Sequence, residues 1–416
     1  MRAIGGAIAR AALEIRNRPD NNGTDAAAPT RRQANSREDN SMFNGIRVID
    51  ADGHVMEPND LYDRYLEAKF KPDLEELKRT AERRPSKFFF GIFHQLDTGR
   101  PLGVPHPDKP LVRTGRNPRA EKPDMRGGWD PHIRIKDMDR EGIDVAVLFA
   151  TVVSSFCSLK TVDFEVAMIR AYNRWIADYC AAYPDRLKAV AVVPMRDPER
   201  AAAMIREAAR TSWAVGVYLS GHVEDRLLDH PGFHPIWQAC QDADLPACFH
   251  GGTARPPYGL GTFEMTNNLF LQHSATNPLE MMRAVAALIG GGVLDMFARL
   301  RVAVLEAGVG WLPFWMERLD EHYELMPEYV PFLRRKPSAA IRSENFFISC
   351  DPDEATLPFV ANFVGPEHIL YASDYPHFDG RFPDTVKLTA RPEVFPPAVQ
   401  RQILWENPRR LYSRIA

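Results

Sequence analysis

The chain is predicted to fold as a (β/α)8 barrel, because short apolar runs alternate with helical patterns along most of its 416 residues. The apolar runs are continuous and rich in β-branched residues, which is typical of strands buried on both faces of a parallel sheet. They cover residues 46–50, 145–150, 188–194, 215–220, 246–251, 301–307, 346–350 and 369–375. A doubly wound open sheet is the alternative fold, but no GxGxxG motif follows the first run.

Most gaps between these runs carry the three-and-four spacing of apolar residues that indicates an amphipathic helix. The stretch "FEVAMIRAYNRWIADYCAAY" ends just before Pro184, and "DPERAAAMIREAART" opens with Asp-Pro and an acidic residue in its first turn. Similar patterns cover residues 234–244, 313–326, 353–364 and 396–412. The alternation of strand and helix therefore continues to the end of the chain.

Composition and charge exclude several classes of protein. The formal net charge is −3 with both signs interspersed, so nothing indicates binding to nucleic acid or to an anionic membrane. No apolar run reaches the roughly 18 residues that a membrane span needs. The cysteines are five, an odd number, and form no CxxC motif, which fits a reducing cytoplasm better than a disulfide framework. We expect a cytoplasmic protein that acts on a small molecule.

Three regions do not follow the alternation of strand and helix. Residues 1–44 are Ala/Arg-rich and then polar, and are predicted to be a disordered tail before a single barrel domain of residues 45–412. Residues 70–133 are predicted to be an insertion over the C-terminal face of the barrel, because so long a Pro/Gly-rich gap is unusual within a compact domain. A second insertion, residues 253–278, follows the fifth run.

Imidazoles and carboxylates occur where the predicted strands end. Asp52 and His54 follow the first run, His250 ends the fifth, Glu306 ends the sixth and Asp374 ends the eighth. Each alone has a simpler explanation, such as capping a turn or a helix. Strand ends of a (β/α)8 barrel gather at one face, however, and imidazole nitrogen with carboxylate oxygen suits zinc, iron or manganese. The sequence therefore predicts a metal site made of these five residues.

Glu306 is predicted to face this metal site. Alternation along "RVAVLE" puts Glu306 on the same face as Val302 and Val304, which we expect to point into the barrel. A carboxylate buried there without a partner would cost several kcal/mol. A nearby cation is therefore expected.

Five stretches carry a resemblance to a known family: "DADGHVMEP", "FHGG", "GVLDMFARLRVAVLEAGVGWLPFWMERLDEH", "GPEHILYASDYPHFDG" and "ENPRRLY". Their order and spacing, over roughly residues 45–412, resemble the amidohydrolase-related branch of the metal-dependent amidohydrolase superfamily. This branch contains aminocarboxymuconate-semialdehyde decarboxylase and related aromatic-acid decarboxylases. The resemblance implies that Asp52, His54, His250 and Asp374 hold a divalent metal. The chain departs from the family pattern at Asp52, where HxH is usual, and at Glu306, where the decarboxylases commonly have a catalytic histidine.

The resemblance implies a metal-dependent hydrolase or decarboxylase for a small, carboxylated or cyclic substrate, with zinc ranked first and iron or manganese as alternatives. Asp374 would be the general base, and His273, or else His377, the proton donor. Glu306 is counted among both the ligands and the catalytic residues. Because it adds a carboxylate, a dinuclear iron- or manganese-dependent oxygenase stays open as an alternative. A barrel with a decayed site that acts as a binding partner is the third hypothesis.

The expected partners are a small-molecule substrate and a second copy of the chain. Trp311, Phe314 and Trp315 lie close together around the start of the helix predicted at 313–326. They are predicted to pack against the barrel, with a homodimer surface as the alternative, because exposed aromatic residues mark interfaces.

Overall fold

The computed structural model describes residues 42–58, 60–82, 125–151, 159–251, 269–377 and 380–416. Its main sheet has eight parallel strands in the order β1-β2-β3-β4-β7-β8-β9-β10. The strands are β1 (Ile49–His54), β2 (Val145–Phe149), β3 (Leu187–Val192), β4 (Ala214–Ser220), β7 (Ala247–His250), β8 (Val302–Leu305), β9 (Phe346–Cys350) and β10 (Ile369–Tyr371). The predicted (β/α)8 barrel is confirmed.

The barrel closes where the first strand meets the segment that follows the last one. The amide of Asp374 donates to the carbonyl of Asp52 at 3.0 Å, and the amide of His54 donates to the carbonyl of Tyr375 at 2.7 Å. We call this junction the seam. The regular ladders pair β1 with β2 and β10 with β9, and none is recorded between β1 and β10 themselves. The seam therefore joins the two ends of the sheet by individual hydrogen bonds.

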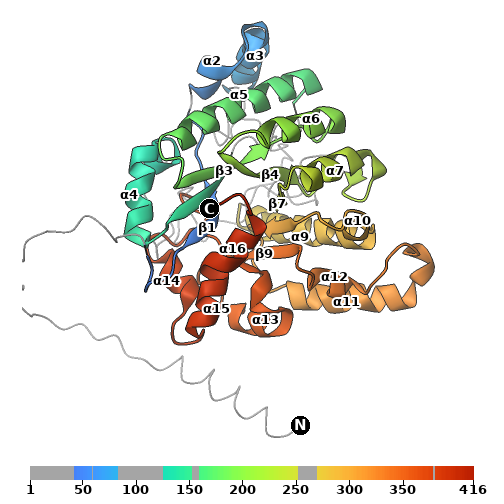
Figure 1. Cartoon of the computed structure of the whole chain (residues 1–416). Helices are drawn as coiled ribbons and strands as arrows, with labels where there is room; N and C mark the ends of the chain where they lie inside the picture. Colours follow the sequence, from blue (N-terminus) through green and yellow to red (C-terminus); the bar gives the residue numbers. More distant parts are fainter. Residues whose placement is uncertain (1–41, 59, 83–124, 152–158, 252–268, 378–379) are drawn as a thin grey trace, which may run out of the picture. The chain divides into compact units, whose positions relative to one another are not determined.

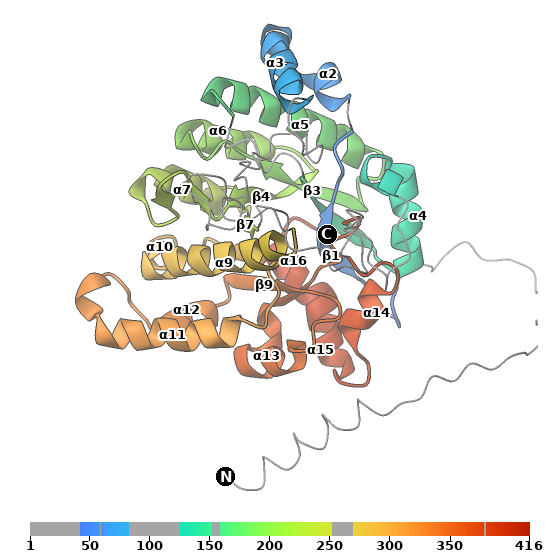
Figure 2. The same ribbon diagram turned by 180° about the vertical axis from the view of Figure 1, so that it is seen from behind.

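Helices lie outside the strands and follow one another around them in chain order (Figures 1 and 2). Those after β2 are α5 (Val162–Ala181), α6 (Pro198–Ala208), α7 (His234–Asp242), α9 (Leu269–Gly290), α10 (Val293–Met296), α11 (Leu312–Leu325), α12 (Pro337–Ile341), α13 (Leu357–Val364), α14 (Thr385–Ala390), α15 (Pro397–Arg401) and α16 (Asn407–Leu411). A π-helical turn, η8 (Gln402–Glu406), joins the last two, and a hairpin of β5 (His222–Val223) and β6 (Arg226–Leu227) follows β4. Among the helices of the described ranges, none combines the length and apolar character that crossing a membrane requires.

The insertion predicted at residues 70–133 lies mostly outside the described residues, as does the predicted tail except for its last three residues. The described parts between β1 and β2 are α2 (Leu61–Tyr65), η1 (Ala68–Phe70), α3 (Lys71–Glu82), η3 (Met125–Gly128) and α4 (Pro131–Glu141). Helix α4 begins at Pro131 because Asp130 caps it by accepting a hydrogen bond from the amide of His132. It ends at Gly142, whose φ of 76° suits glycine.

The second predicted insertion is partly wrong, because α9 begins at Leu269, within residues 253–278. Pro278 lies inside this helix. Proline is favoured at the first helical position and disfavoured in the interior of a helix. The helix nevertheless begins nine residues before Pro278 and continues through it.

The first strand contains a β-bulge that decides where its polar side chains point. Asp50 is paired with Ala146 and Gly53 with Leu148, so two residues of β1 stand opposite one of β2. Asp50 and Gly53 consequently share one face, which is turned outward. His54 falls on the other face, inside the barrel. The strand also runs to His54 rather than ending at residue 50 as predicted.

We expect Gly53→Ala to destabilise the protein by about 1–3 kcal/mol, because a methyl group there would overpack the seam. A Cβ at Gly53 would lie 2.8 Å from Asp50 Oδ2 and 3.6 Å from Arg134 Nη1. Gly290→Ala is the matched control, since a Cβ there meets nothing within 4 Å and alanine favours the helix. Urea unfolding of both variants tests this. Equal stability of Gly53→Ala and the wild type would show that the close contact is unimportant.

Candidate metal centre

Strands β1 and β7 each present a histidine to the interior of the barrel. The Nε2 atoms of His54 and His250 lie only 2.9 Å apart. His250 Nδ1 can donate to the carbonyl of Gly251 at 3.1 Å. His54 Nδ1 lies 3.2 Å from the hydroxyl of Thr151, which donates its own proton to the carbonyl of Val55 and therefore accepts from the imidazole. In the neutral form of each ring, Nε2 carries a lone pair directed at the same point, as in metal-bound histidines.

Asp52 adds a carboxylate from the same strand as His54. Its Oδ1 lies 3.5 Å from His54 Nε2 and 3.7 Å from His250 Nε2. The three ligand atoms lie within 4.8 Å of one another, and all three residues are buried. The bulge in β1 makes this possible, since it turns Asp52 and His54 inward while Asp50 points outward.

Glu306 joins the group, although the alternation argument that predicted this is wrong. Leu305 is paired with His250 in the sheet, so Leu305 faces inward, whereas Val304 is paired with Phe249. Phe249 faces the helices, since its ring packs against that of Trp237 on α7. A continued strand would therefore point Glu306 outward.

A left-handed backbone turns Glu306 toward the interior. Its φ is 48°, a conformation that residues with a side chain rarely adopt. Glu306 Oε2 consequently lies 2.9 Å from His250 Nε2 and 3.5 Å from His54 Nε2. Asn277 on α9 holds the other oxygen, donating to Oε1 at 2.8 Å. The sequence alone does not reveal this turn, because the residue is not a glycine.

Asp374 reaches the group from the seam with the same backbone conformation, at a φ of 54°. Its Oδ1 lies 3.5 Å from His54 Nε2 and 2.7 Å from Nδ1 of His377. The ring of His377 also lies against that of His54, with centroids 4.0 Å apart, and its Nε2 is 3.0 Å from the hydroxyl of Thr151. The possible ligand atoms of His54, Glu306, Asp374 and His377 lie within 4.8 Å of one another.

The charges of these groups depend strongly on one another. Burial raises the pKa of Asp52 and lowers the pKa of His54 well below its ordinary value. Burial also opposes protonation of His250, but the carboxylates of Glu306 and Asp52 outweigh it and raise the pKa of His250 well above its ordinary value. Burial likewise opposes ionisation of Glu306, yet His250 holds the pKa of Glu306 well below its usual range. Without a metal, a proton on His250 would thus balance part of the negative charge.

A divalent cation fits this arrangement. Asp52 Oδ1 and Glu306 Oε2 are buried oxygens that accept no hydrogen bond of suitable geometry from the described residues. Such oxygens would cost several kcal/mol unless a cation lies between them. The donor atoms are two imidazole nitrogens and three carboxylate oxygens, a set that suits a divalent transition metal.

A cavity of about 320 Å³ adjoins the centre. Glu306 and Asp374 form part of its wall, together with Asp351, Asp353 and Arg381. Its other described lining residues are Ser274, Asn277, Pro278, Ala307, Gly308, Pro352, Ser373 and Gly380. The volume suits one small organic molecule placed beside the metal ligands.

Comparison with known families agrees with this geometry. The model of the amidohydrolase family matches residues 49–414, which span the barrel from β1 onward. The chain belongs to the amidohydrolase family. The resemblance seen in the sequence is confirmed, and this amidohydrolase is an enzyme of the superfamily that contains metal-dependent hydrolases and carboxy-lyases.

Several relatives of this amidohydrolase are decarboxylases. It is 23% identical over 248 residues to 2-amino-3-carboxymuconate-6-semialdehyde decarboxylase of Dictyostelium discoideum, covering 60% of this chain and 67% of that one. It is 26% identical over 264 residues to gamma-resorcylate decarboxylase of Rhizobium radiobacter, covering 58% and 76% of the two chains.

Among solved structures, 5-carboxyvanillate decarboxylase of Novosphingobium aromaticivorans aligns with a TM-score of 0.65. The alignment covers 91% of this chain and 100% of that one at 20% identity, so it shows a shared fold. That structure contains manganese and 4-hydroxy-3-methoxy-5-nitrobenzoic acid. These relatives lend no support to the dinuclear oxygenase that the extra carboxylate of Glu306 had left open.

The structure of this amidohydrolase thus brings together Asp52, His54, His250, Glu306 and Asp374, although their role as ligands stays a prediction. The side chain of His273 lies outside the described residues, and its backbone belongs to α9 rather than to a loop before it. Sequence reasoning missed Thr151 and Asn277, which hold His54 and Glu306 in place. Neither stands in a recognisable motif, so the sequence carries no signal for these contacts.

Proposed function

We propose that this amidohydrolase is a metal-dependent decarboxylase of a small aromatic or otherwise cyclic carboxylic acid. The observation that carries the proposal is the convergence of the five ligand-type side chains beside a cavity of suitable size. The decarboxylase names of several relatives support the reaction type. Hydrolysis on the same site is the competing outcome.

The proposed ligands are Asp52, His54, His250, Glu306 and Asp374. Three of these donors are carboxylates. An oxygen-rich set favours manganese over zinc, the metal expected first from the sequence. When bound, a divalent ion supplies an anchor for an anionic substrate and stabilises developing negative charge. The manganese in the related decarboxylase structure supports this choice.

The chain's own residues would bind and orient the acid in the cavity. Arg381 contributes a positive charge to a wall that also carries Asp351 and Asp353. Its Nε lies 2.8 Å from Asp353 Oδ2. A substrate with hydroxyl groups could hydrogen-bond to these carboxylates. The cavity therefore suits a hydroxylated ring better than a purely apolar one.

Decarboxylation also needs a proton. The bond between the ring carbon and the carboxyl carbon breaks, carbon dioxide leaves, and the ring carbon receives a proton in its place. Glu306 is not suited to donate it, because its pKa lies well below the usual range. His377 is the better candidate, since His377 Nδ1 and Asp374 Oδ1 lie 2.7 Å apart and can share a proton beside the cavity.

The test combines metal analysis with a substrate panel. The purified chain should contain a divalent metal, and the manganese-loaded protein should release carbon dioxide from at least one hydroxylated benzoic acid. Chelation should abolish the release, and manganese should restore it. Hydrolysis products without carbon dioxide would overturn the decarboxylase proposal. A folded protein that binds no metal would instead indicate a barrel with a decayed site.

We further propose that the enzyme acts in the cytoplasm as a homodimer. Phe314 on α11 and Phe359 on α13 are 58% and 60% exposed, which supports an interface on this side of the barrel. Trp311 and Trp315 instead pack partly against the core.

A further inference from the structure

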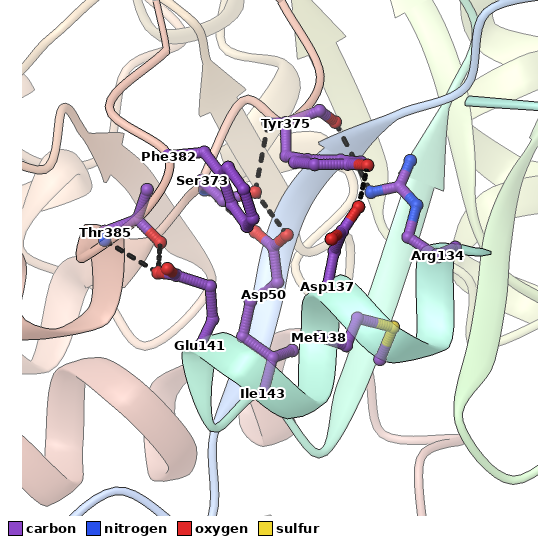
Figure 3. A pocket seen from close by; sticks show the side chains of 10 residues that line it. All are labelled: Asp50, Arg134, Asp137, Met138, Glu141, Ile143, Ser373, Tyr375, Phe382 and Thr385. Carbon is purple, nitrogen blue, oxygen red and sulfur yellow. Dashed lines mark hydrogen bonds between the residues drawn. The ribbon is translucent and has the colours of Figure 1, made fainter. Parts of the chain in front are cut away.

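One face of α4 is turned toward the seam. Arg134, Asp137 and Glu141 follow one another at intervals of three and four residues, so they project from the same side of the helix. Each of them contacts the segment that follows β10, and Figure 3 shows their side chains reaching toward Tyr375 and Thr385 past β1. This segment carries Asp374.

Arg134 links the two backbones that meet at the seam. Its Nη2 donates to the carbonyl of His54, its Nη1 donates to the carbonyl of Tyr375 at 3.4 Å, and its Nε donates to the carbonyl of Gly127 at 3.2 Å. The guanidinium also lies on the ring of Tyr375, 4.4 Å from its centre. Arg134 is 1% exposed, and no other arginine or lysine of the described residues is buried. So complete a burial is tolerable only because the donors are used.

The other two residues of this face hold the same segment by its side chains and amides. The hydroxyl of Tyr375 donates to Asp137 Oδ2. Glu141 accepts from the amides of Asp384 at 2.6 Å and Thr385 at 2.7 Å. These contacts fasten the segment on the C-terminal side of Asp374.

Asp50 on β1 holds the segment on the N-terminal side of Asp374. Its carboxylate accepts from the amide and the hydroxyl of Ser373, at 2.9 and 2.6 Å. The space left among these residues is only about 10 Å³, roughly the volume of one water probe, so the seam is a packed joint rather than a binding pocket.

This geometry sets the spacing between two proposed ligands. His54 Nε2 and Asp374 Oδ1 lie 3.5 Å apart, but they come from opposite ends of the sheet. Since no regular ladder joins those ends, the separation depends on a few hydrogen bonds, and Arg134 contacts both sides. We propose that Arg134 and Asp137 are positioning residues for the metal centre. The inference rests on the proposed metal site, but not on which reaction takes place there.

The test compares the affinity of full-length variants for Mn²⁺. Arg134→Lys keeps the buried positive charge but loses the planar fork that reaches three carbonyls at once. This variant should bind Mn²⁺ about 10-fold more weakly. Mutating a residue that orients a metal ligand lowers metal affinity by about 10–100-fold, and the expected effect is at the lower end of this range. Tyr375→Phe removes only the hydroxyl that donates a hydrogen bond to Asp137. It should weaken Mn²⁺ binding by a smaller factor than Arg134→Lys does. Affinities are measured by electron paramagnetic resonance of free Mn²⁺, at a temperature where circular dichroism shows each variant folded.

Arg186→Lys is the matched control. Arg186 also donates to two backbone carbonyls, those of Ile143 and Asp144, but at the other end of the barrel. This variant should lose stability while its affinity for Mn²⁺ stays within about 2-fold of the wild type. The inference is overturned if Arg134→Lys binds Mn²⁺ like the wild type, or no more weakly than Arg186→Lys. If Arg134→Lys does not fold, unchanged affinity in Tyr375→Phe overturns it.

The result separates this inference from the proposed function. A wild type that binds Mn²⁺ without releasing carbon dioxide contradicts the decarboxylase, while the variants still decide the role of Arg134. A wild type that binds no Mn²⁺ overturns the positioning role together with the metal site.

Discussion

Replacing His250 with alanine should abolish both metal binding and activity. The imidazole lies at the centre of the group, with Nε2 2.9 Å from His54 Nε2 and 2.9 Å from Glu306 Oε2. Mutating a residue that only orients a metal ligand lowers metal affinity by about 10–100-fold. Loss of a ligand itself should therefore lower the affinity by at least about 100-fold. The metal content of purified His250→Ala, measured by mass spectrometry, checks this together with its turnover.

An exposed histidine provides the control for this change. His322 lies on α11, outside the strands of the barrel, where its Nδ1 can donate to the carbonyl of Arg318. His322→Ala should keep the metal content of the wild type. Stoichiometric metal in His250→Ala would remove His250 from the ligand set.

Glu306→Gln should weaken metal binding by about 10–100-fold and change its dependence on pH. The substitution keeps the shape of the side chain and an oxygen for the hydrogen bond from Asn277, but it removes the charge. In the wild type, the charge of Glu306 helps raise the pKa of His250 well above its ordinary value, so a proton competes with the metal. Affinity of the wild type should therefore rise with pH through the neutral range, as that proton becomes easier to displace.

In Glu306→Gln, metal affinity should rise less with pH than in the wild type. Without the carboxylate, the pKa of His250 falls, and the competition moves to lower pH. Titration with a chromophoric chelator at pH 6, 7 and 8 measures both effects.

Asp353→Asn separates ligation from the general effect of charge in the cavity. Asp353 lines the same cavity but pairs with Arg381 rather than with the histidines. It should leave affinity and its pH dependence nearly unchanged. If Glu306→Gln and Asp353→Asn weaken metal binding equally, Glu306 acts only through the electrostatic effect of its charge and is not a ligand.

The strands could be predicted from the sequence because their burial on both faces leaves a continuous apolar signal. The start of β7 at Ala247 and the whole of β9 at Phe346–Cys350 fall within the predicted runs. The end of β1 was missed because buried polar residues look like the end of a strand. Only the structure shows that β1 continues through a bulge between Asp50 and Gly53 and pairs His54 with Phe149 of β2.

The site was predictable as a set of residues but not as a geometry. Strand ends that carry ligand-type side chains identified Asp52, His54, His250, Glu306 and Asp374. The orientation of Glu306 depends on a left-handed backbone that alternation along a strand cannot predict. The contacts of Thr151, Asn277 and Arg134 come from segments far away in the chain, and a single sequence holds no record of such proximity.

The position of the seam also determines when the metal can bind during folding. The hydrogen bond from the hydroxyl of Ser373 to Asp50 joins residues 323 positions apart. Such a contact carries a large loop-closure entropy and forms late in a chain of high contact order. A nascent chain that has not yet emerged beyond β9 lacks Asp374, even though the other four proposed ligands have been synthesised. A bound metal would therefore add its binding free energy to the final closure of the ring, and metal uptake would report that the first and last strands have met.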